Sequence, residues 1–176
     1  LGDNIFYGNG LEEILKRAAE KAEKGRATIF GYHVNDPQRF GIVEFDKSGK
    51  VLSVEEKPKN PKSNYCITGL YFYDKRVSEL AKKVVPSDRG ELEITDLNKL
   101  YLDEGDLDAE LLGIGFAWLD TGTMDSLVEA SEFVQMISKR QDITISAPEE
   151  IAYANGWITK ERLLESAEKY GKSPYG

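Results

Sequence analysis

The sequence predicts an α/β domain with a mixed sheet, followed by a helical tail. Segments rich in β-branched and aromatic residues alternate with segments of helical periodicity, which is the pattern of α/β folds. Two strand-like segments, 40–45 and 51–56, are joined by the short turn 46–49, so they predict a hairpin within the sheet. The chain then ends in helical segments. We expect a partial domain over residues 1–145 and a helical segment over residues 146–176.

The first helix and the strand after it are predicted from periodicity and from turn residues. Apolar residues recur at helical spacing between residues 11 and 22, namely Leu11, Ile14, Leu15, Ala18, Ala19 and Ala22. Asn9 is the expected N-cap, with Glu12 three positions on, and Gly25 closes the helix. The β-prone run 26–34 predicts a strand that ends in the polar residues before Pro37.

The second half of the chain is interpreted in the same way. Residues 59–64 are polar and predict a loop, and the aromatic-rich run 65–73 predicts the next strand. Asp74 is expected to cap a helix that Pro86 ends, and a second helix is expected over 92–102 before a strand at 109–114. A longer helix follows residues 118–123, with Met124, Leu127, Val128, Val134 and Ile137 on one face. Short helices are expected from Pro148 and over 159–170.

Length and charge exclude several functional classes. The 176 residues are enough for one domain with a substantial core. The 23 Lys and Arg against 31 Asp and Glu give a net charge of -8, which argues against nonspecific binding to nucleic acid or to an anionic membrane. Cys66 is the one cysteine, so no internal disulfide or cysteine-based metal site is expected, and a cytoplasmic setting fits. No apolar run is long enough for a membrane span.

Glu56 and Lys57 are the first candidate functional residues, because an apolar strand ends there. Pro58 cannot donate to a strand ladder, so the extended segment should finish near Lys57. A carboxylate and an ammonium group at one sheet edge suit a ligand that carries hydroxyls and a phosphate. The alternative is that these charges only solvate a turn.

Asp3 and Asp120 are the second candidate pair. Each is expected where an apolar strand ends in a loop, and in open α/β sheets such carboxyl ends face the ligand crevice. Mg²⁺ accepts one or two protein carboxylates and takes its remaining ligands from water and phosphates. The alternatives are an Asx turn at Asp3 and a helix cap at Asp120. His33, the lone histidine, has no Ser or Cys partner nearby in sequence and is interpreted as structural.

Taken together, these stretches resemble one family closely. It is the family of sugar-1-phosphate nucleotidylyltransferases, and within it the short-form glucose-1-phosphate thymidylyltransferases. The matching segments are LGDNIFYG at 1–8, GYHVNDP at 31–37, EEKP at 55–58, TGLYFYD at 68–74, RGELEITD at 89–96 and WLDTGT at 118–123. They follow the family's order along nearly the whole chain. The resemblance implies a Rossmann-like nucleotidyltransferase fold.

The resemblance also implies a role for each candidate. Asp3 and Asp120 match the aspartates that bind Mg²⁺, and Asp3 and Lys57 are the implied catalytic residues, with Lys57 at the sugar phosphate. The implied substrate-binding residues are Phe40, Gly41, Glu56, Lys57, Ile67 and Trp118. Glu56 would accept from sugar hydroxyls, and the backbone amide of Gly41 would reach the sugar. Phe40 stands where the family usually has tyrosine, so it lacks that hydroxyl.

The implied reaction is nucleotidyl transfer from dTTP to glucose 1-phosphate, which gives dTDP-glucose and pyrophosphate. The alternatives are a uridylyl- or cytidylyltransferase, and a noncatalytic sugar-phosphate sensor or regulatory subunit. The family's glycine-rich loop, which holds the triphosphate, has no match here. The chain is therefore expected to lack the N-terminal third and to show little or no turnover by itself. A homo-oligomer, dimer or tetramer, is expected through the C-terminal helices.

Overall fold

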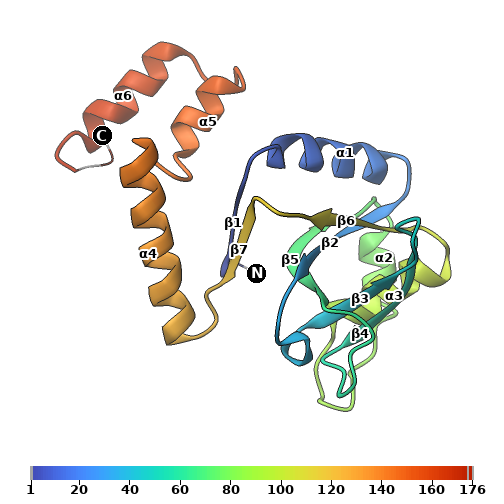
Figure 1. Cartoon of the computed structure of the whole chain (residues 1–176). Coiled ribbons are helices and arrows are strands. Elements are labelled where there is room, and N and C mark those ends of the chain that lie inside the picture. The colour runs from blue at the N-terminus through green and yellow to red at the C-terminus, as the bar shows by residue number, and fades with distance from the viewer. Residues whose placement is uncertain (1, 174, 176) are drawn as a thin grey trace. The chain divides into compact units, whose positions relative to one another are not determined.

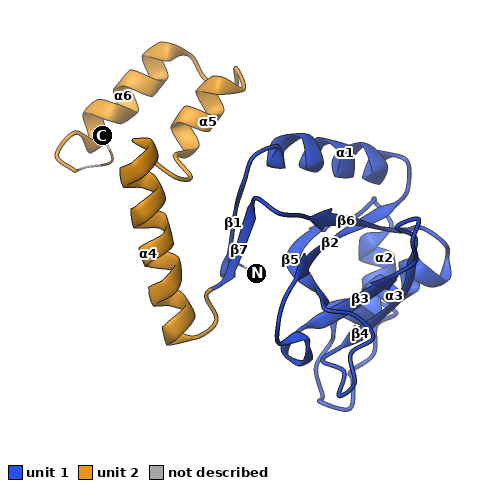
Figure 2. Cartoon of the chain, in the orientation of Figure 1, with its two compact units in different colours: residues 1–120 blue, residues 121–176 orange. Residues whose placement is uncertain are grey.

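The structure is a computed structural model that describes residues 2–173 and 175 (Figure 1). The chain forms two compact units, residues 1–120 and 121–176, which Figure 2 colours separately. The boundary expected from the sequence lay after residue 145. In the structure the division falls after residue 120, where strand β7 (Phe116–Asp120) ends. The next helix, α4 (Met124–Gln141), belongs to the second unit together with the helices after it.

Five strands of the first unit form one mixed sheet in the order β4-β3-β5-β2-β6. They are β2 (Ala27–His33), β3 (Gly41–Phe45), β4 (Val51–Glu56), β5 (Tyr65–Phe72) and β6 (Leu107–Leu112). β2 and β6 are parallel, and the other pairings are antiparallel. The predicted hairpin is therefore present as β3 and β4, while β6 begins at Leu107 rather than at residue 109.

The remaining two strands of this unit form a separate antiparallel pair. β1 (Asn4–Gly8) pairs with β7, and the register sets Asn4 opposite Asp120. The two strands run side by side in Figure 1. Asp3 thus precedes a strand, and the expectation that it ends one is wrong. Because the pair is antiparallel, the start of β1 and the carboxyl end of β7 nevertheless lie at the same end of the pair.

The helices of the first unit are α1 (Leu11–Glu23), α2 (Val77–Ala81) and α3 (Ile94–Asp103), with a 3₁₀ turn at Pro37–Arg39. Gly10, not Asn9, is the N-cap of α1, and its φ of 79° is a conformation that glycine adopts without strain. Asp74 does not cap α2, whose N-cap is Arg76. The carboxylate of Asp74 is used instead in the buried contacts described below.

The core has two parts because neighbouring residues of β2 face opposite sides of the sheet. Ile29 packs in one cluster with Leu97 and Tyr101 of α3, and Phe30 packs in the other with Ala18 of α1. Figure 1 shows α1 on one side of the sheet and α3 on the other. Burial of a side chain of this size contributes about 1.5–3 kcal/mol. The alternation of apolar side chains along β2 therefore holds a helix on each face.

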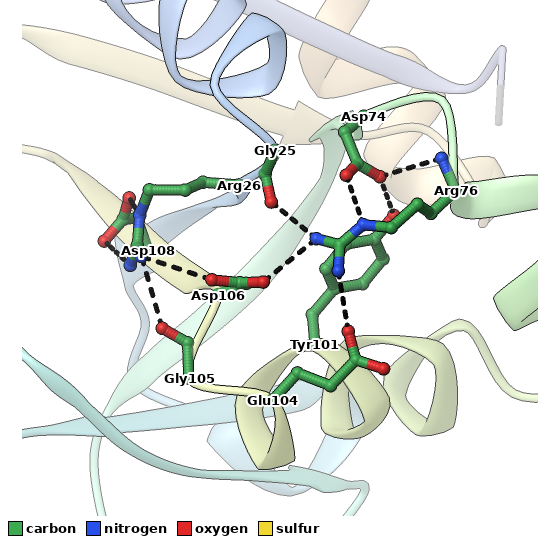
Figure 3. Close-up of polar contacts among 9 residues, drawn as sticks. All are labelled: Gly25, Arg26, Asp74, Arg76, Tyr101, Glu104, Gly105, Asp106 and Asp108. Atoms are coloured by element: carbon green, nitrogen blue, oxygen red, sulfur yellow. Dashed lines mark hydrogen bonds and ion pairs between the residues drawn. The ribbon is translucent and has the colours of Figure 1, made fainter.

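The guanidinium of Arg76 joins three connections of the first unit (Figure 3). Nε donates to Oδ2 of Asp74 at 2.5 Å, and Nη2 donates to the carbonyl of Gly25 at 2.5 Å and to Asp106 Oδ2 at 3.0 Å. Nη1 reaches Oε2 of Glu104 at 2.9 Å. Arg76 therefore ties the turn after α1 to the start of α2 and to the loop between α3 and β6.

Asp74 is the buried carboxylate of this group, and it also accepts from the hydroxyl of Tyr101 at 2.7 Å. Burial opposes its ionisation, but the hydrogen bonds from Tyr101 and Arg76 outweigh that effect and lower the pKa of Asp74. Beside it, Arg26 donates to both carboxylate oxygens of Asp108, at 2.7 and 2.9 Å, and the pKa of Asp108 is lowered as well. The negative forms of both aspartates stabilise the fold.

The second unit contains α4, α5 (Pro148–Ala154) and α6 (Lys160–Tyr170). Thr123 caps α4 in a capping box with Ser126, which excludes Asp120 as the cap. Pro148 starts α5 as predicted, and Thr159 caps α6. In the described part of the chain, no helix combines the length and the apolar character that a membrane span requires.

The lowered pKa of Asp74 predicts a specific dependence of stability on pH. A carboxylate whose pKa is lower in the folded than in the unfolded protein contributes stability above its unfolded pKa, about 3.9, and loses it as the pH falls through the folded value. We expect Asp74→Asn to have a lower urea midpoint than the wild type at pH 7. We expect the two midpoints to converge as the pH falls from about 5 to about 2.

Asp88→Asn is the matched control, because Asp88 is an exposed aspartate of the same unit. Its urea midpoint should follow that of the wild type at every pH. Some acid sensitivity should persist in Asp74→Asn, since Asp108 is unchanged. A constant difference between wild type and Asp74→Asn across this range would contradict the role assigned to Asp74.

Candidate functional site

Glu56 and Lys57 lie at the end of β4, where the register of the hairpin sets Gly41 opposite Glu56. The backbone amide of Lys57 donates to the carbonyl of Phe40 at 3.1 Å. Lys57 has a φ of 40°, in the left-handed region that strains a residue with a Cβ. A regular strand would send Glu56 and Lys57 to opposite faces, and the left-handed backbone of the exposed Lys57 interrupts that alternation.

The carboxylate of Glu56 is held by α3. The buried hydroxyl of Thr95, in the first turn of α3, donates to Glu56 Oε2 at 2.5 Å, and Arg89 Nη1 lies 3.8 Å from Oε1. A Cβ on Gly41 would lie 3.1 Å from Glu56 Oε2 and 3.7 Å from Ile67 Cδ1, so glycine leaves the carboxylate room. Glu56, Gly41 and Ile67 are therefore neighbours, as the proposed sugar contacts require.

Tyr71 of β5 is half-buried, and the charge of Glu56 affects its ionisation. Burial raises the pKa of Tyr71 to about 12, and the negative charge of Glu56 acts in the same direction. Its ring stacks on Tyr73 with centroids 5.9 Å apart. Tyr71 therefore remains a neutral hydroxyl at physiological pH.

The antiparallel register of β1 and β7 sets Asp120 opposite Asn4. Asp3 is the residue before Asn4, and its Oδ1 accepts a hydrogen bond from Asn4 Nδ2 at 3.0 Å. Asp3 and Asp120, far apart in sequence, therefore both lie next to Asn4. Two aspartates at the same end of one strand pair are compatible with the metal hypothesis.

Trp118 joins this strand pair to the hairpin. Its ring packs edge-on against Phe40, with centroids 5.4 Å apart, and against Tyr32 at 5.8 Å. Phe40 precedes Gly41 and accepts from the amide of Lys57. The structure thus brings the predicted residues into two groups in the same unit, which meet at the contact between Phe40 and Trp118. One group is Gly41, Glu56, Lys57 and Ile67, and the other is Asp3 and Asp120.

The donor chemistry at Asp3 and Asp120 fits Mg²⁺. Among residues 2–173 and 175, no group of three or more His, Cys, Asp or Glu is arranged to hold a metal ion. Mg²⁺ does not need such a group, because it prefers oxygen donors and usually keeps water and phosphate ligands beside one or two carboxylates. A pair of aspartates is therefore a sufficient protein contribution.

Three residues of this site, Thr95, Arg89 and Asn4, were not among the candidates expected from the sequence. Thr95 and Arg89 both contact Glu56, and the amide of Asn4 links Asp3 to Trp118. All three fall inside segments that carry the family resemblance. The residue pattern alone could not identify them, because Glu56 is distant in sequence from Thr95 and Arg89, and Trp118 is distant from Asn4.

His33 and two cavities are not part of the candidate site. His33 is exposed and packs edge-on against Tyr65, with ring centroids 5.4 Å apart. A cavity of about 730 Å³ lies between the hairpin turn and the end of α3, where Lys50 and Glu104 line it. A second, of about 210 Å³, lies within the C-terminal unit beside Glu149 and Tyr170. No predicted site residue lines either one, so the arrangement of side chains, not cavity volume, defines the candidate site.

Comparison with known proteins identifies relatives over the whole chain. The chain is 56% identical over 176 residues to the glucose-1-phosphate thymidylyltransferase of Xanthomonas campestris pv. campestris (strain B100), and 54% identical to that of Neisseria gonorrhoeae. Each match covers all of this chain and 59% or 60% of the relative, respectively. The chain therefore spans about three fifths of the length of these relatives.

Solved structures agree with the predicted fold. A protein described as a glucose-1-phosphate thymidylyltransferase from Bacillus anthracis, in complex with sucrose, matches with a TM-score of 0.64 and 40% identity. That match covers 76% of this chain and 52% of the other. A UDP-glucose pyrophosphorylase complexed with UDP-glucose matches with a TM-score of 0.64 at 20% identity, over 76% of this chain and 53% of the other, and so supports the fold alone.

The prediction of a Rossmann-like nucleotidyltransferase fold with a mixed sheet is confirmed. The family described as nucleotidyl transferase matches residues 1–136, which include every predicted site residue. By this match and by its identity to the thymidylyltransferases, the chain belongs to the nucleotidyl transferase family.

Proposed function

We propose that this chain forms the sugar-phosphate-binding part of an enzyme that transfers a thymidylyl group from dTTP to glucose 1-phosphate. The products are dTDP-glucose and pyrophosphate. The observation that carries the proposal is the pairing of β1 with β7, which sets Asp120 opposite the residue after Asp3. The identity of 51–56% to glucose-1-phosphate thymidylyltransferases from three bacterial genera supports this choice of substrates.

The sugar is bound at Glu56 in this proposal. Its carboxylate accepts from sugar hydroxyls and stays oriented because Thr95 donates to it at 2.5 Å. Gly41, opposite Glu56, offers its backbone amide to the sugar, and Ile67 gives an apolar contact. Phe40 and Trp118 line the same region with their rings. The pairing of β3 with β4 thus gathers the groups that recognise the sugar.

Lys57 acts on the phosphate of glucose 1-phosphate. An oxygen of that phosphate attacks the α-phosphorus of dTTP, a new P–O bond forms, and the bond to the leaving pyrophosphate breaks. Catalysis of this kind rests on alignment and on charge neutralisation, and the ammonium of Lys57 supplies a compact positive charge beside the attacking group. The strained backbone of Lys57 supports such a role, because strain of this kind clusters at functional sites.

Asp3 and Asp120 would hold Mg²⁺ through their carboxylate oxygens. When bound, the cation neutralises negative charge on the phosphates of the nucleotide. The part of each relative that this chain does not match is where we propose that the triphosphate and the base are bound. This chain by itself is then expected to show little or no turnover.

The rival function is a noncatalytic sugar-phosphate sensor. A sensor does not need a pair of metal-binding carboxylates, so the proximity of Asp3 and Asp120 to Asn4 favours the enzyme. A uridylyl- or cytidylyltransferase would have the same site in this chain. The identity to named thymidylyltransferases favours dTTP over the other two nucleotides.

Nucleotide specificity tests the proposal directly. The full-length protein is expected to release pyrophosphate from dTTP in the presence of glucose 1-phosphate and Mg²⁺. Its kcat/KM for dTTP should exceed the values for UTP and CTP by about tenfold or more. A sensor would instead bind dTDP-glucose without Mg²⁺ and release no pyrophosphate. A preference for UTP would assign the protein to the uridylyltransferases.

Lys57→Ala tests the proposed role of the ammonium group. We expect kcat of the full-length protein to fall by about 10²-fold or more, the size found for one preorganised electrostatic group. Lys59→Ala is the matched control, because Lys59 is an exposed lysine of the same loop, and it should retain wild-type kcat. Near-normal turnover of Lys57→Ala would remove Lys57 from the mechanism.

We also propose that the protein forms a dimer or tetramer in the cytoplasm. The C-terminal unit exposes large apolar side chains, with Met124 77% exposed and Trp157 74% exposed, and these support the oligomer. The buried free thiol of Cys66 fits the cytoplasm. Light scattering of this 176-residue chain is expected to give a mass of at least twice the 19.7 kDa of one copy. A monomer at micromolar concentration would contradict the oligomer.

A further inference from the structure

The side-chain amide of Asn4 is bonded at both of its polar atoms. Its Oδ1 accepts from the indole Nε1 of Trp118 at 2.6 Å and from the backbone amide of Gly69 at 3.2 Å. Its Nδ2 donates to Oδ1 of Asp3 at 3.0 Å. The two N–H donors require an oxygen at the Oδ1 position, so Nδ2 is the atom that faces Asp3. One side chain thus connects β1, β5 and β7.

Gly69 provides the space for this amide. A Cβ at position 69 would lie 2.6 Å from Asn4 Nδ2, 2.8 Å from Cγ and 2.9 Å from Oδ1, closer than non-bonded atoms approach. Gly69 is not among the glycines with positive φ, so its backbone does not itself require glycine. The residue is therefore explained by the close approach of the Asn4 side chain.

We propose that Asn4 is a positioning residue, which orients the carboxylate of Asp3 for a divalent cation and couples it to the ring of Trp118. The proposal rests on the proposed function, in which Asp3 is a metal ligand. A carboxylate has about four lone-pair sites on its two oxygens, so Asp3 can accept from Asn4 while it binds a cation. Partners that hydrogen-bond to metal ligands commonly set the orientation of those ligands.

The geometry gives this role a distinctive consequence. Because Oδ1 and Nδ2 belong to one planar amide, displacement of Asn4 disturbs the bond to Trp118 and the bond to Asp3 together. Trp118 also packs against Phe40, so the same displacement reaches the hairpin that carries Glu56. A change on β5, at Gly69, should therefore alter both Asp3 and Trp118 through the side chain of Asn4.

The test uses two variants that displace the same amide by different means. Asn4→Ala removes it, and Gly69→Ala pushes it away with a methyl group and changes no polar side chain. In this 176-residue chain with Trp157→Phe, Trp118 is the one tryptophan, so its indole N–H gives a single NMR cross-peak. We expect both variants to weaken Mn²⁺ binding by about 10- to 100-fold and to shift that cross-peak upfield.

Asn60→Ala and Gly113→Ala are the matched controls. Asn60 is exposed in a loop, and a Cβ at Gly113 would meet no atom within 4 Å. Both should keep wild-type Mn²⁺ affinity and the wild-type indole resonance. Thermal melting by circular dichroism separates positioning from a general loss of structure, and Asn4→Ser replaces Asn4→Ala if the alanine variant does not fold.

Asp3→Asn distinguishes failure of this proposal from failure of the proposed function. If Mn²⁺ binding is absent or is unchanged by Asp3→Asn, the metal site itself is wrong and the positioning role falls with it. If Asp3→Asn abolishes binding while folded Asn4→Ala and Gly69→Ala keep wild-type affinity, Asn4 has no positioning role and the proposed function stands. Weaker binding in both variants, with a shifted indole resonance and unchanged melting, supports the proposal.

Discussion

The antiparallel pairing of β1 with β7 is the constraint on which the candidate site depends. It connects the first described residues to strand β7, which ends the first unit, and its register decides that Asn4 lies opposite Asp120. A shift of the register by one residue would turn every side chain of one strand to the other face of the pair. The hydrogen bond that Trp118 donates to Asn4 requires this register, because it crosses the strand pair.

The hairpin supplies the other group of site residues, and the regular strand ends in strained backbone at Lys57. Lys57 follows β4 with a left-handed backbone, which interrupts the regular alternation of side chains along the strand. Glu56 in turn is held by Thr95 at the start of α3, and α3 is held by the packing of Leu97 and Tyr101 under the sheet. The core of the domain therefore orients a polar group at its edge.

The polar contacts around Arg76 hold other elements of the first unit together. They join the ends of α1 and α3 to the start of α2, at residues that carry no proposed chemistry. The buried carboxylate of Asp74 is satisfied by Tyr101 and Arg76, which is why it can remain ionised inside the fold. The lowered pKa of Asp74 therefore reflects a structural role. The proposed site residues are identified by their positions in the fold instead.

Local pattern determined most of the secondary structure from the sequence alone, since helical periodicity, turn residues and prolines act within a few positions. It predicted the hairpin and the mixed sheet, whereas the roles of the site residues came from the resemblance of whole segments to a known family. It failed where a local rule competed with tertiary contacts. Asp74 is bonded to Arg76 and Tyr101 instead of capping α2, and Asp3 precedes strand β1 instead of ending a strand. Only the tertiary structure decided that Asp3 and Asp120 both lie beside Asn4 and that Thr95 holds Glu56, because strand register and helix packing join residues that no local pattern connects.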